Sequence, residues 1–471
     1  MRGVARLLLL LAAPALGACG GGGDGRPNVI LFLIDTLRAD HLSCYGHAAN
    51  TTPNLDAFAR EGILFENCWA QAPQTAPSHA TLFTSTEPAA HGIWNDVPSP
   101  SGEVLHPALA DGAVTLAEVL RDAGWRTAAI ADGGWLIPER GLDQGFEHFE
   151  SRTRGVVDRV QRGLEWLEDN ADRGRPFFLF LHTYEVHTPY LPPPGYEDRF
   201  AADYRGPMRE VLARARAYAA SPEIANPLTD VQKKIVNPAL AEADEADTAF
   251  VAALYDAELS LVDEQFALLI GWLRVHDLLD RTILIVTSDH GEEFAEHGEF
   301  GHKQVYEECL RVPLLIRLPG GPRGLRRRDP ARLLDLAPSL LAELGLEPPA
   351  AMAGRDLAWR GGDLGLDADG FVAETNHPRR QAAWRSGGRK VVLRLGPDRG
   401  GQVFDLAADP DEKRPMDEPD WIGRARTALE AYHELATDRR EKFGLQPRLQ
   451  GLEDLDPEQR AELAQLGYVD Q

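Results

Sequence analysis

The stretch that decides the fold is RPNVILFLIDTLRADH, residues 26–41. Six consecutive apolar residues, 29–34, are bounded by Pro27 and Asp35. A short, uninterrupted apolar run of this kind is typical of a strand buried on both faces of a parallel sheet. Similar runs occur at residues 125–132, 176–184, 282–290 and 312–320, with amphipathic segments between them. This alternation predicts an α/β fold with a doubly wound, mostly parallel sheet covered by helices on both faces.

The alternation of apolar runs and amphipathic segments is interrupted at two places. Residues 192–248 are rich in prolines and charges, so we expect an inserted excursion near the strand ends and a candidate lid. QAAWRSGGRKVVLRLG, residues 381–396, places Gly-Gly between two alternating runs and predicts an antiparallel hairpin. We therefore expect an α/β domain over 28–365, a C-terminal antiparallel subdomain over 366–435, and a tail over 436–471 that packs on the body.

The N-terminus predicts an attachment to a membrane. Two arginines precede a short apolar run, and Leu16, Gly17, Ala18 and Cys19 resemble the lipobox of bacterial lipoproteins. The resemblance implies a signal peptide over residues 1–18, a lipid on the Cys19 sulfur and a glycine-rich tether over 19–27. The protein would then lie in the bacterial cell envelope, periplasmic or on the outer surface, with membrane contact through Cys19 only. An ordinary secretory signal is the alternative.

Charge and cysteine content restrict the partners and the covalent links. The formal net charge is −24, from 49 Lys and Arg against 73 Asp and Glu, which argues against a nucleic-acid partner. Beyond Cys19, the chain has Cys44, Cys68 and Cys309, without the paired spacing of a zinc knuckle. One disulfide or three free thiols are both compatible with this number.

Acidic and imidazole side chains follow two of the predicted strands. Asp35 ends the first, while Asp289 and His290 end the strand over 282–290. The carboxyl ends of parallel strands are where ligands bind in doubly wound sheets. Two carboxylates and an imidazole form a mixed oxygen and nitrogen site, which favours zinc or manganese over calcium.

The segment QTAPSHATLFTS, residues 74–85, places Thr75 ahead of Pro77 at the first turn of a predicted helix. Backbone N–H groups at such a turn favour an anion. A threonine hydroxyl next to a divalent cation becomes a nucleophile toward phosphorus or sulfur. On this segment alone, a threonine that only caps the helix is the alternative.

Five segments occur in the order seen in the sulfatase family of the alkaline phosphatase superfamily, which this chain resembles over nearly its whole mature length. They are ILFLIDTLRADHLSCYG (30–46), TAPSHATLFTS (75–85), LHTYEVHTPYLPP (181–193), IVTSDHGEEFAEHGEFGHKQVYEECLRVPLLIRLPG (285–320) and VFDLAADPDE (403–412).

The resemblance implies a metal-dependent hydrolase of sulfate or phosphate esters. Asp35, Asp289 and His290 match metal ligands, and Thr75 matches the nucleophile, which also contacts the metal. His187 matches a residue that contacts the transferred group or protonates the leaving oxygen. Lys303 matches a lysine that holds the same anion, and His302 falls where related transferases keep a histidine. The substrate would be a sulfated or phosphorylated small molecule, glycan or lipid.

The chain departs from the family pattern at three places. Formylglycine sulfatases have Cys or Ser where Thr75 stands and Arg where His79 stands; since Thr cannot become that aldehyde, no formylglycine is expected. Thr36 replaces a second aspartate, which again favours zinc or manganese. IADGGWLIP, residues 130–138, lacks the anion-binding lysine and histidine of many sulfatases. These departures raise phosphomonoesters, phosphodiesters and phosphonates as substrates.

Two other functions remain open. One is transfer of a phospho-headgroup to an exterior glycan, in which an alcohol replaces water. The other is a catalytically inactive, surface-binding lipoprotein on the same fold. Outside the family context, His182 and His297 read as ordinary core or surface histidines, and His91 reads as structural.

Overall fold

A computed structural model of the chain describes residues 25–95, 97–98, 104–152, 155–171, 174–221, 227–362, 370–376, 379–396 and 399–450. The predicted signal peptide, Cys19, residues 19–24 of the tether and the tail after residue 450 lie outside these ranges. Within them, no helix combines the length and the apolar character needed to cross a membrane.

The main sheet confirms the predicted fold class. Its strand order is β12-β2-β11-β8-β1-β7-β5-β6, with β13 also paired to β2. The apolar run after Pro27 forms β1 in the middle of this order and pairs in parallel with both β7 and β8. The strands are β1 Asn28–Ile34, β2 Ile63–Trp69, β5 Arg126–Ala131, β6 His148–Ser151, β7 Phe177–Thr183, β8 Thr282–Thr287, β11 Arg311–Arg317, β12 Leu325–Arg327 and β13 Ala331–Arg332. β11 runs antiparallel to both β8 and β2.

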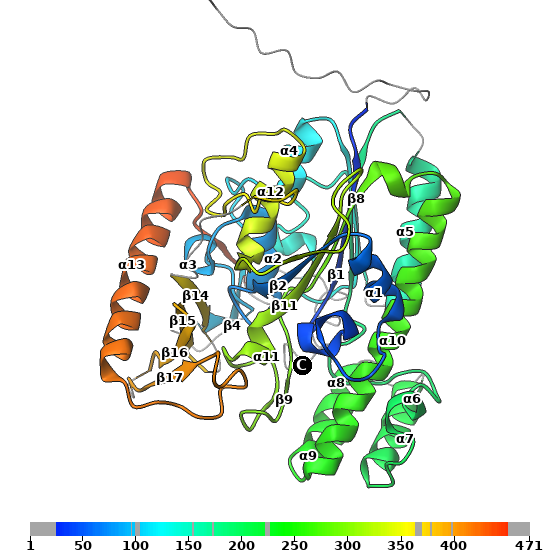
Figure 1. Cartoon of the computed structure of the whole chain (residues 1–471), viewed down its shortest axis with the longest axis vertical. Helices are drawn as coiled ribbons and strands as arrows, with labels where there is room; N and C mark the ends of the chain where they lie inside the picture. Colours follow the sequence, from blue (N-terminus) through cyan, green and yellow to red (C-terminus); the bar gives the residue numbers. More distant parts are fainter. Residues whose placement is uncertain are drawn as a thin grey trace, which may run out of the picture.

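Successive side chains of β1 enter two different cores, as the period of a strand requires. Val29, Leu31 and Leu33 pack with one set of helices, and Ile30 and Phe32 pack with the other. The first set comprises α2 Thr75–Thr84, α4 Leu116–Asp122 and α12 Leu336–Glu343. The second comprises α1 Pro53–Arg60, α5 Val156–Asn170 and the long α10 Glu245–Val275. Helices therefore cover both faces of the sheet (Figure 1).

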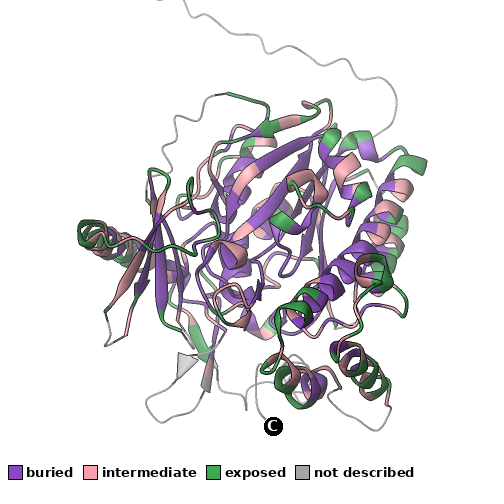
Figure 2. Ribbon diagram, turned by 60° about the horizontal axis from the view of Figure 1, so that its bottom comes forward, coloured by how far each residue is buried: buried purple, intermediate pink, exposed green. Residues whose placement is uncertain are grey.

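The predicted excursion contains several short helices joined by turns in the residues that the structure describes, and these helices lie beside one end of α10 (Figure 1). They are α6 Asp198–Ala201, α7 Met208–Ala219, α8 Pro227–Val231, a π-helix over Gln232–Val236 and α9 Asn237–Leu240. Tyr196 and Arg199 fasten its start to α10 through Glu264, at 2.8 and 2.7 Å. Figure 2 shows the buried sheet at the centre and the exposed outer faces of these helices.

A second, antiparallel sheet confirms the predicted hairpin. It contains β14 Phe371–Thr375, β15 Gln381–Ser386, β16 Arg389–Arg394 and β17 Gly401–Asp405, in that order. Gly387 and Gly388 turn β15 into β16 with φ values of 57° and 81°, which glycine adopts without strain.

Helix α13, Pro419–Phe443, covers this second sheet and runs without a break past residue 435 (Figure 1). Ala425 and Leu429 pack against the second sheet, whereas Ala436 packs against the main core. One continuous helix therefore joins the two parts of the protein through residue 435.

Short elements complete the fold: α3 Pro88–His91, α11 Glu307–Leu310, β3 Val97–Pro98, β4 Val104–Ala108, β9 Glu293–Phe294, β10 Phe300–Gly301 and β18 Arg448–Gln450. The pairing of β18 with β4 returns the chain after α13 to the body of the protein. Cys44, Cys68 and Cys309 are free thiols.

Candidate active site

Two neighbouring strands deliver the three predicted metal ligands to one edge of the main sheet. Asp35 follows β1, and Asp289 and His290 follow β8 after one intervening serine. All three side chains are buried, and their ligand atoms lie within 4.8 Å of one another. The structure therefore brings together the three residues that the sequence analysis selected from segments more than 250 positions apart.

The two carboxylates have unsatisfied oxygens. Within the described chain, neither oxygen of Asp35 and only one of the two oxygens of Asp289 has a hydrogen-bond partner. The satisfied oxygen, Oδ1 of Asp289, accepts from the backbone N–H of Thr36 at 3.2 Å and of His290 at 2.9 Å. Burial and the negative charge of Asp289 raise the pKa of Asp35 well above its ordinary value. Because such groups are costly to bury alone, the pair fits a divalent cation.

His290 presents the correct nitrogen to this site. Its Nδ1 lies 2.9 Å from the carbonyl oxygen of Gly291, which fixes the proton on Nδ1 as a hydrogen-bond donor. The lone pair on Nε2 then faces Asp289 Oδ2 at 3.4 Å and Thr75 Oγ1 at 3.4 Å. A backbone carbonyl that orients the far nitrogen is a common feature of metal-binding histidines.

Thr75 is the first residue of α2, as the sequence analysis predicted from Pro77, and it is fully buried. Gln74 before it is extended, and the backbone N–H of Ala76 donates to Asn95 Oδ1 at 3.1 Å. The hydroxyl of Thr75 therefore lies at a helix N-terminus and beside His290, where it can reach an anion held near the cluster.

Two further predicted residues, His187 and His302, form a pair. Their Nε2 atoms lie 3.3 Å apart, while their Nδ1 atoms face the carbonyls of Thr188 at 2.7 Å and Pro73 at 3.0 Å. The His302 ring lies 4.4 Å from the His290 ring, which places the pair beside the cluster. Burial lowers the pKa of His187 to about 4 and lowers the pKa of His302 well below its ordinary value.

Lys303 differs from the other predicted residues in its surroundings. It directly follows His302, but its side chain is exposed. Nothing in the described part of the chain joins Lys303 to Asp35, Thr75 or the Asp289–His290 pair by a hydrogen bond or an ion pair. Its role as an anion-holding residue stays a prediction.

Two histidines with no role predicted from the sequence lie against the acids. His182 Nε2 is 3.5 Å from Asp35 Oδ2, and His79 Nδ1 is 3.6 Å from Asp289 Oδ2. Their rings are 5.1 Å apart, and both are fully buried. Their positions in the secondary structure could have identified them. His79 lies one helical turn after Thr75 on α2, and His182 pairs with Leu33 in the register of β7 and β1.

Other expectations concerned neighbouring residues. The Thr36 side chain turns away from the cluster, because its hydroxyl donates toward backbone carbonyls such as that of Val186, at 2.7 Å. His91 is structural, as predicted: its Nε2 lies 3.0 Å from Thr81 Oγ1, and its Nδ1 accepts from the backbone N–H of Ile93 at 3.0 Å.

Comparisons with known proteins agree with this architecture. The family model described as Sulfatase matches residues 27–346. An N-acetylglucosamine-6-O-sulfatase of Bacteroides thetaiotaomicron is 27% identical, over 74% of this chain and 74% of its own length. The multifunctional alkaline phosphatase superfamily protein PehA of Trinickia caryophylli is 26% identical, over 70% of this chain and 76% of its own length.

Solved structures show the same fold. The phosphonate monoester hydrolase of Agrobacterium radiobacter superposes with a TM-score of 0.64 at 20% identity, covering 91% of this chain and 97% of that one. The family model spans well over half of the chain, including the main sheet and the segments that carry Asp35, Thr75, Asp289 and His290. The chain therefore belongs to the sulfatase family of the alkaline phosphatase superfamily.

Proposed function

We propose that this sulfatase-family hydrolase cleaves sulfate or phosphate esters with Thr75 as its nucleophile and a divalent metal ion held by Asp35, Asp289 and His290. The observation that carries the proposal is the convergence of these three ligands on a buried threonine hydroxyl, 3.4 Å from His290 Nε2. The mixed donor set favours zinc or manganese. When bound, the cation would lower the pKa of the Thr75 hydroxyl and offset the charge of the transferred group.

The reaction of this chain's residues has two steps. Thr75 Oγ1, whose proton has passed to solvent, bonds to the sulfur or phosphorus atom, and the bond from that atom to the ester oxygen breaks. The leaving oxygen takes a proton from the His187–His302 pair, whose Nε2 atoms face each other at 3.3 Å. In the second step a water oxygen bonds to the transferred group, the pair takes the water's proton, and Thr75 is released.

The histidine pair is suited to hold a single proton. In neutral rings, each Nδ1 carries its proton toward a backbone carbonyl, so any additional proton lies between the two Nε2 atoms. A bound anion raises the pKa of both rings, because an opposite charge stabilises the imidazolium form. The pair therefore takes up its proton when the substrate is bound.

The threonine at position 75 supports phosphate chemistry over formylglycine chemistry. Thr75 stands where formylglycine sulfatases have Cys or Ser, and its ester must be opened by water. His79 and His182 supply imidazoles beside the two carboxylates, at 3.6 and 3.5 Å. We therefore propose phosphomonoesters, phosphodiesters or phosphonate esters as substrates ahead of sulfate esters, on a small molecule, glycan or lipid.

The test is a substrate panel with defined metal content. Metal-free protein is reconstituted with zinc or manganese and assayed with 4-nitrophenyl sulfate, 4-nitrophenyl phosphate and bis(4-nitrophenyl) phosphate. We expect metal-dependent turnover, with a phosphate ester preferred, and its loss in Asp289→Asn. An added alcohol acceptor separates hydrolysis from group transfer, since transfer yields a new ester. Equal, metal-independent rates in both proteins would refute the proposal.

We also propose that the protein is anchored in the bacterial cell envelope by a lipid on Cys19. The support is the sequence around Cys19 alone. Radiolabelled fatty acid should enter the wild-type chain and not Cys19→Ala, and the variant should leave the membrane fraction. Fatty-acid labelling of Cys19→Ala equal to that of the wild type would contradict the proposed lipid anchor.

A further inference from the structure

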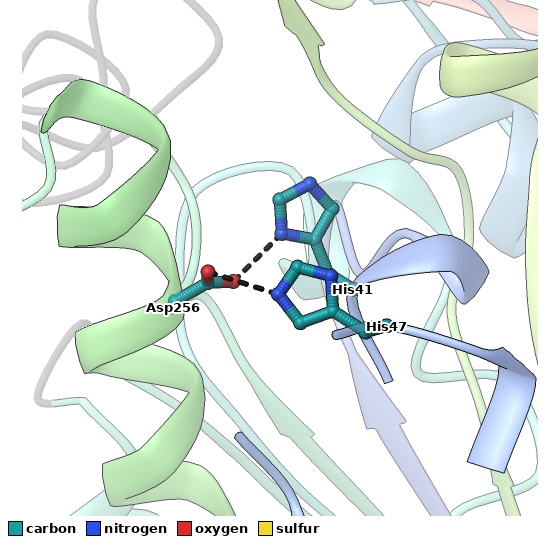
Figure 3. Close-up of side chains that lie close together, drawn as sticks. All are labelled: His41, His47 and Asp256. Atoms are coloured by element: carbon teal, nitrogen blue, oxygen red, sulfur yellow. Dashed lines mark hydrogen bonds and ion pairs between the residues drawn. The ribbon is translucent and has the colours of Figure 1, made fainter. Parts of the chain in front are cut away.

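A second cluster of metal-binding side chains lies outside the candidate active site and shares no residue with it. His41 ends a short 3-10 helix, Ala39–His41, and His47 follows another, Ser43–Tyr45. Both face Asp256 on α10, as Figure 3 shows. His41 Nδ1 is 2.7 Å from Asp256 Oδ1, and His47 Nε2 is 3.1 Å from Asp256 Oδ2. All three ligand atoms lie within 4.8 Å of one another.

The electrostatics of the cluster favour a cation between these groups. The side chains of Asp256 and His41 are 9% and 10% exposed, and that of His47 is 21% exposed. A carboxylate this deeply buried needs a compensating positive charge beside it, and a divalent cation between Asp256 and the two imidazoles would supply it.

The ring arrangement supports the same conclusion. The two imidazoles are stacked, with centroids 4.9 Å apart and planes 25° from parallel, so that both point their nitrogens at one carboxylate (Figure 3). If each ring carried a full positive charge, the two charges would repel at this separation. A single divalent ion bound by two neutral rings removes that repulsion and keeps all three contacts.

We propose that His41 Nδ1, His47 Nε2 and Asp256 bind a zinc ion. Zinc takes imidazole and carboxylate ligands at about 2.0–2.2 Å, so two ligands on one ion lie about 3.3 Å apart. The 3.1 Å pair is already close to that separation, and the 2.7 Å pair would lengthen by about 0.6 Å to admit the ion. Three protein ligands leave one position of a tetrahedral site for water, and His47 provides the solvent-facing side from which the ion enters.

The position of this site suggests a structural role next to the candidate active site. Tyr255, the neighbour of Asp256 on α10, donates its hydroxyl to the carbonyl of Thr36 at 3.0 Å and accepts from the N–H of Arg38 at 2.9 Å. Tyr255 therefore holds the start of the segment that leaves Asp35, and the zinc site holds its continuation at His41 and His47. A bound ion would fasten the whole segment after Asp35 to α10.

The experiment measures zinc alone, in full-length protein whose other site is disabled. In the Asp289→Asn, His290→Gln background we expect one zinc per chain after equilibration with zinc and gel filtration. Adding Asp256→Asn, which keeps the side-chain shape, should lower zinc affinity by at least about tenfold. Glu374→Gln is the matched control, because His433 Nε2 lies 3.0 Å from Glu374, but these two residues belong to no three-ligand group among the described residues. Glu374→Gln should leave the stoichiometry unchanged.

A second variant tests the same inference in otherwise wild-type protein, so that misfolding of the Asp289→Asn, His290→Gln background cannot explain the result. His47→Ala, at a partly exposed position in otherwise wild-type protein, should lower the zinc content by one per chain and reduce the zinc-dependent rise in melting temperature. When cobalt replaces zinc, the His47→Ala protein should lack the visible absorption of one tetrahedral cobalt centre that its parent shows. Zinc content and affinity that are equal in His47→Ala, Asp256→Asn and their parent proteins would overturn the inference and leave a hydrogen-bonded His–Asp–His bridge.

Discussion

Replacing Glu185 by glutamine should make the protein more stable at alkaline pH. Glu185 lies in the loop between Thr183, at the end of β7, and His187, and its Oε2 accepts from the backbone N–H of Val156 at 2.8 Å. Burial, together with the nearby charge of Asp132, raises the pKa of Glu185 to about 7. In the unfolded chain the same carboxyl titrates near its ordinary value of 4.5. The folded protein thus binds a proton that the unfolded chain releases.

The sign and size of the effect follow from this difference. A carboxyl with a raised folded pKa costs no stability below about pH 4.5, and stability is lost as the pH rises through about 7. A shift from 4.5 to about 7 corresponds to about 3.5 kcal/mol at most, at about 1.4 kcal/mol per pKa unit. Glu185 is half-buried, and the new amide needs an acceptor, so we expect Glu185→Gln to gain about 1–2 kcal/mol at pH 8 and nothing at pH 4.5.

Urea denaturation of the wild type and Glu185→Gln at both pH values measures this difference. Glu150 provides a matched control of opposite sign, because Arg159 and Arg162 lower its pKa despite its partial burial. Glu150→Gln should gain nothing at pH 8. A Glu185→Gln protein that is no more stable than the wild type at pH 8, or equally stabilised at both pH values, would refute the reasoning.

Two other predictions concern the histidine pair and the junction of the two sheets. His187→Ala should lower kcat/KM, which reports the step that releases the leaving group, by roughly 10²–10⁴-fold for alkyl esters but far less for 4-nitrophenyl esters, because only the poor leaving group needs a proton; equal losses in kcat/KM for both substrates would exclude the acid role. Lys390→Met should cost about 3–5 kcal/mol of unfolding free energy, because Lys390 is fully buried between Glu307 and Glu412, each at 3.0 Å. In that test Arg360→Met, which breaks an exposed pair with Glu343, should cost less than about 1 kcal/mol, and a similar cost in both variants would contradict the burial argument.

The parts of the fold that sequence analysis predicted are those with a local physical signal. The apolar run of β1 reads as a strand buried on both faces, and the two cores that meet there confirm it. Helix α4 is one of the amphipathic segments between the predicted strands; it follows Thr115, whose side chain caps the N–H of Glu118, and ends before Gly124. Gly387 and Gly388 specified the hairpin, because their positive φ angles match its turn.

The parts it did not predict depend on long-range contacts. The apolar run of β11 reads the same in both directions, so its antiparallel pairing with β8 has no local signal. Helix α13 continues through residue 435 because Ala436 meets the main core, a contact between segments far apart in the chain. His182 and His79 reach the two aspartates through strand register and helix phase, which residue identity alone does not reveal.

The direct test of the proposed mechanism is turnover by Thr75→Ala and Thr75→Ser at measured metal content. Thr75→Ala removes the hydroxyl that lies 3.4 Å from His290 Nε2 and leaves Asp35, Asp289 and His290 in place. The proposal predicts that metal-loaded Thr75→Ala hydrolyses neither aryl sulfate nor aryl phosphate esters above background, while Thr75→Ser keeps part of the activity. Wild-type turnover in metal-loaded Thr75→Ala would contradict it.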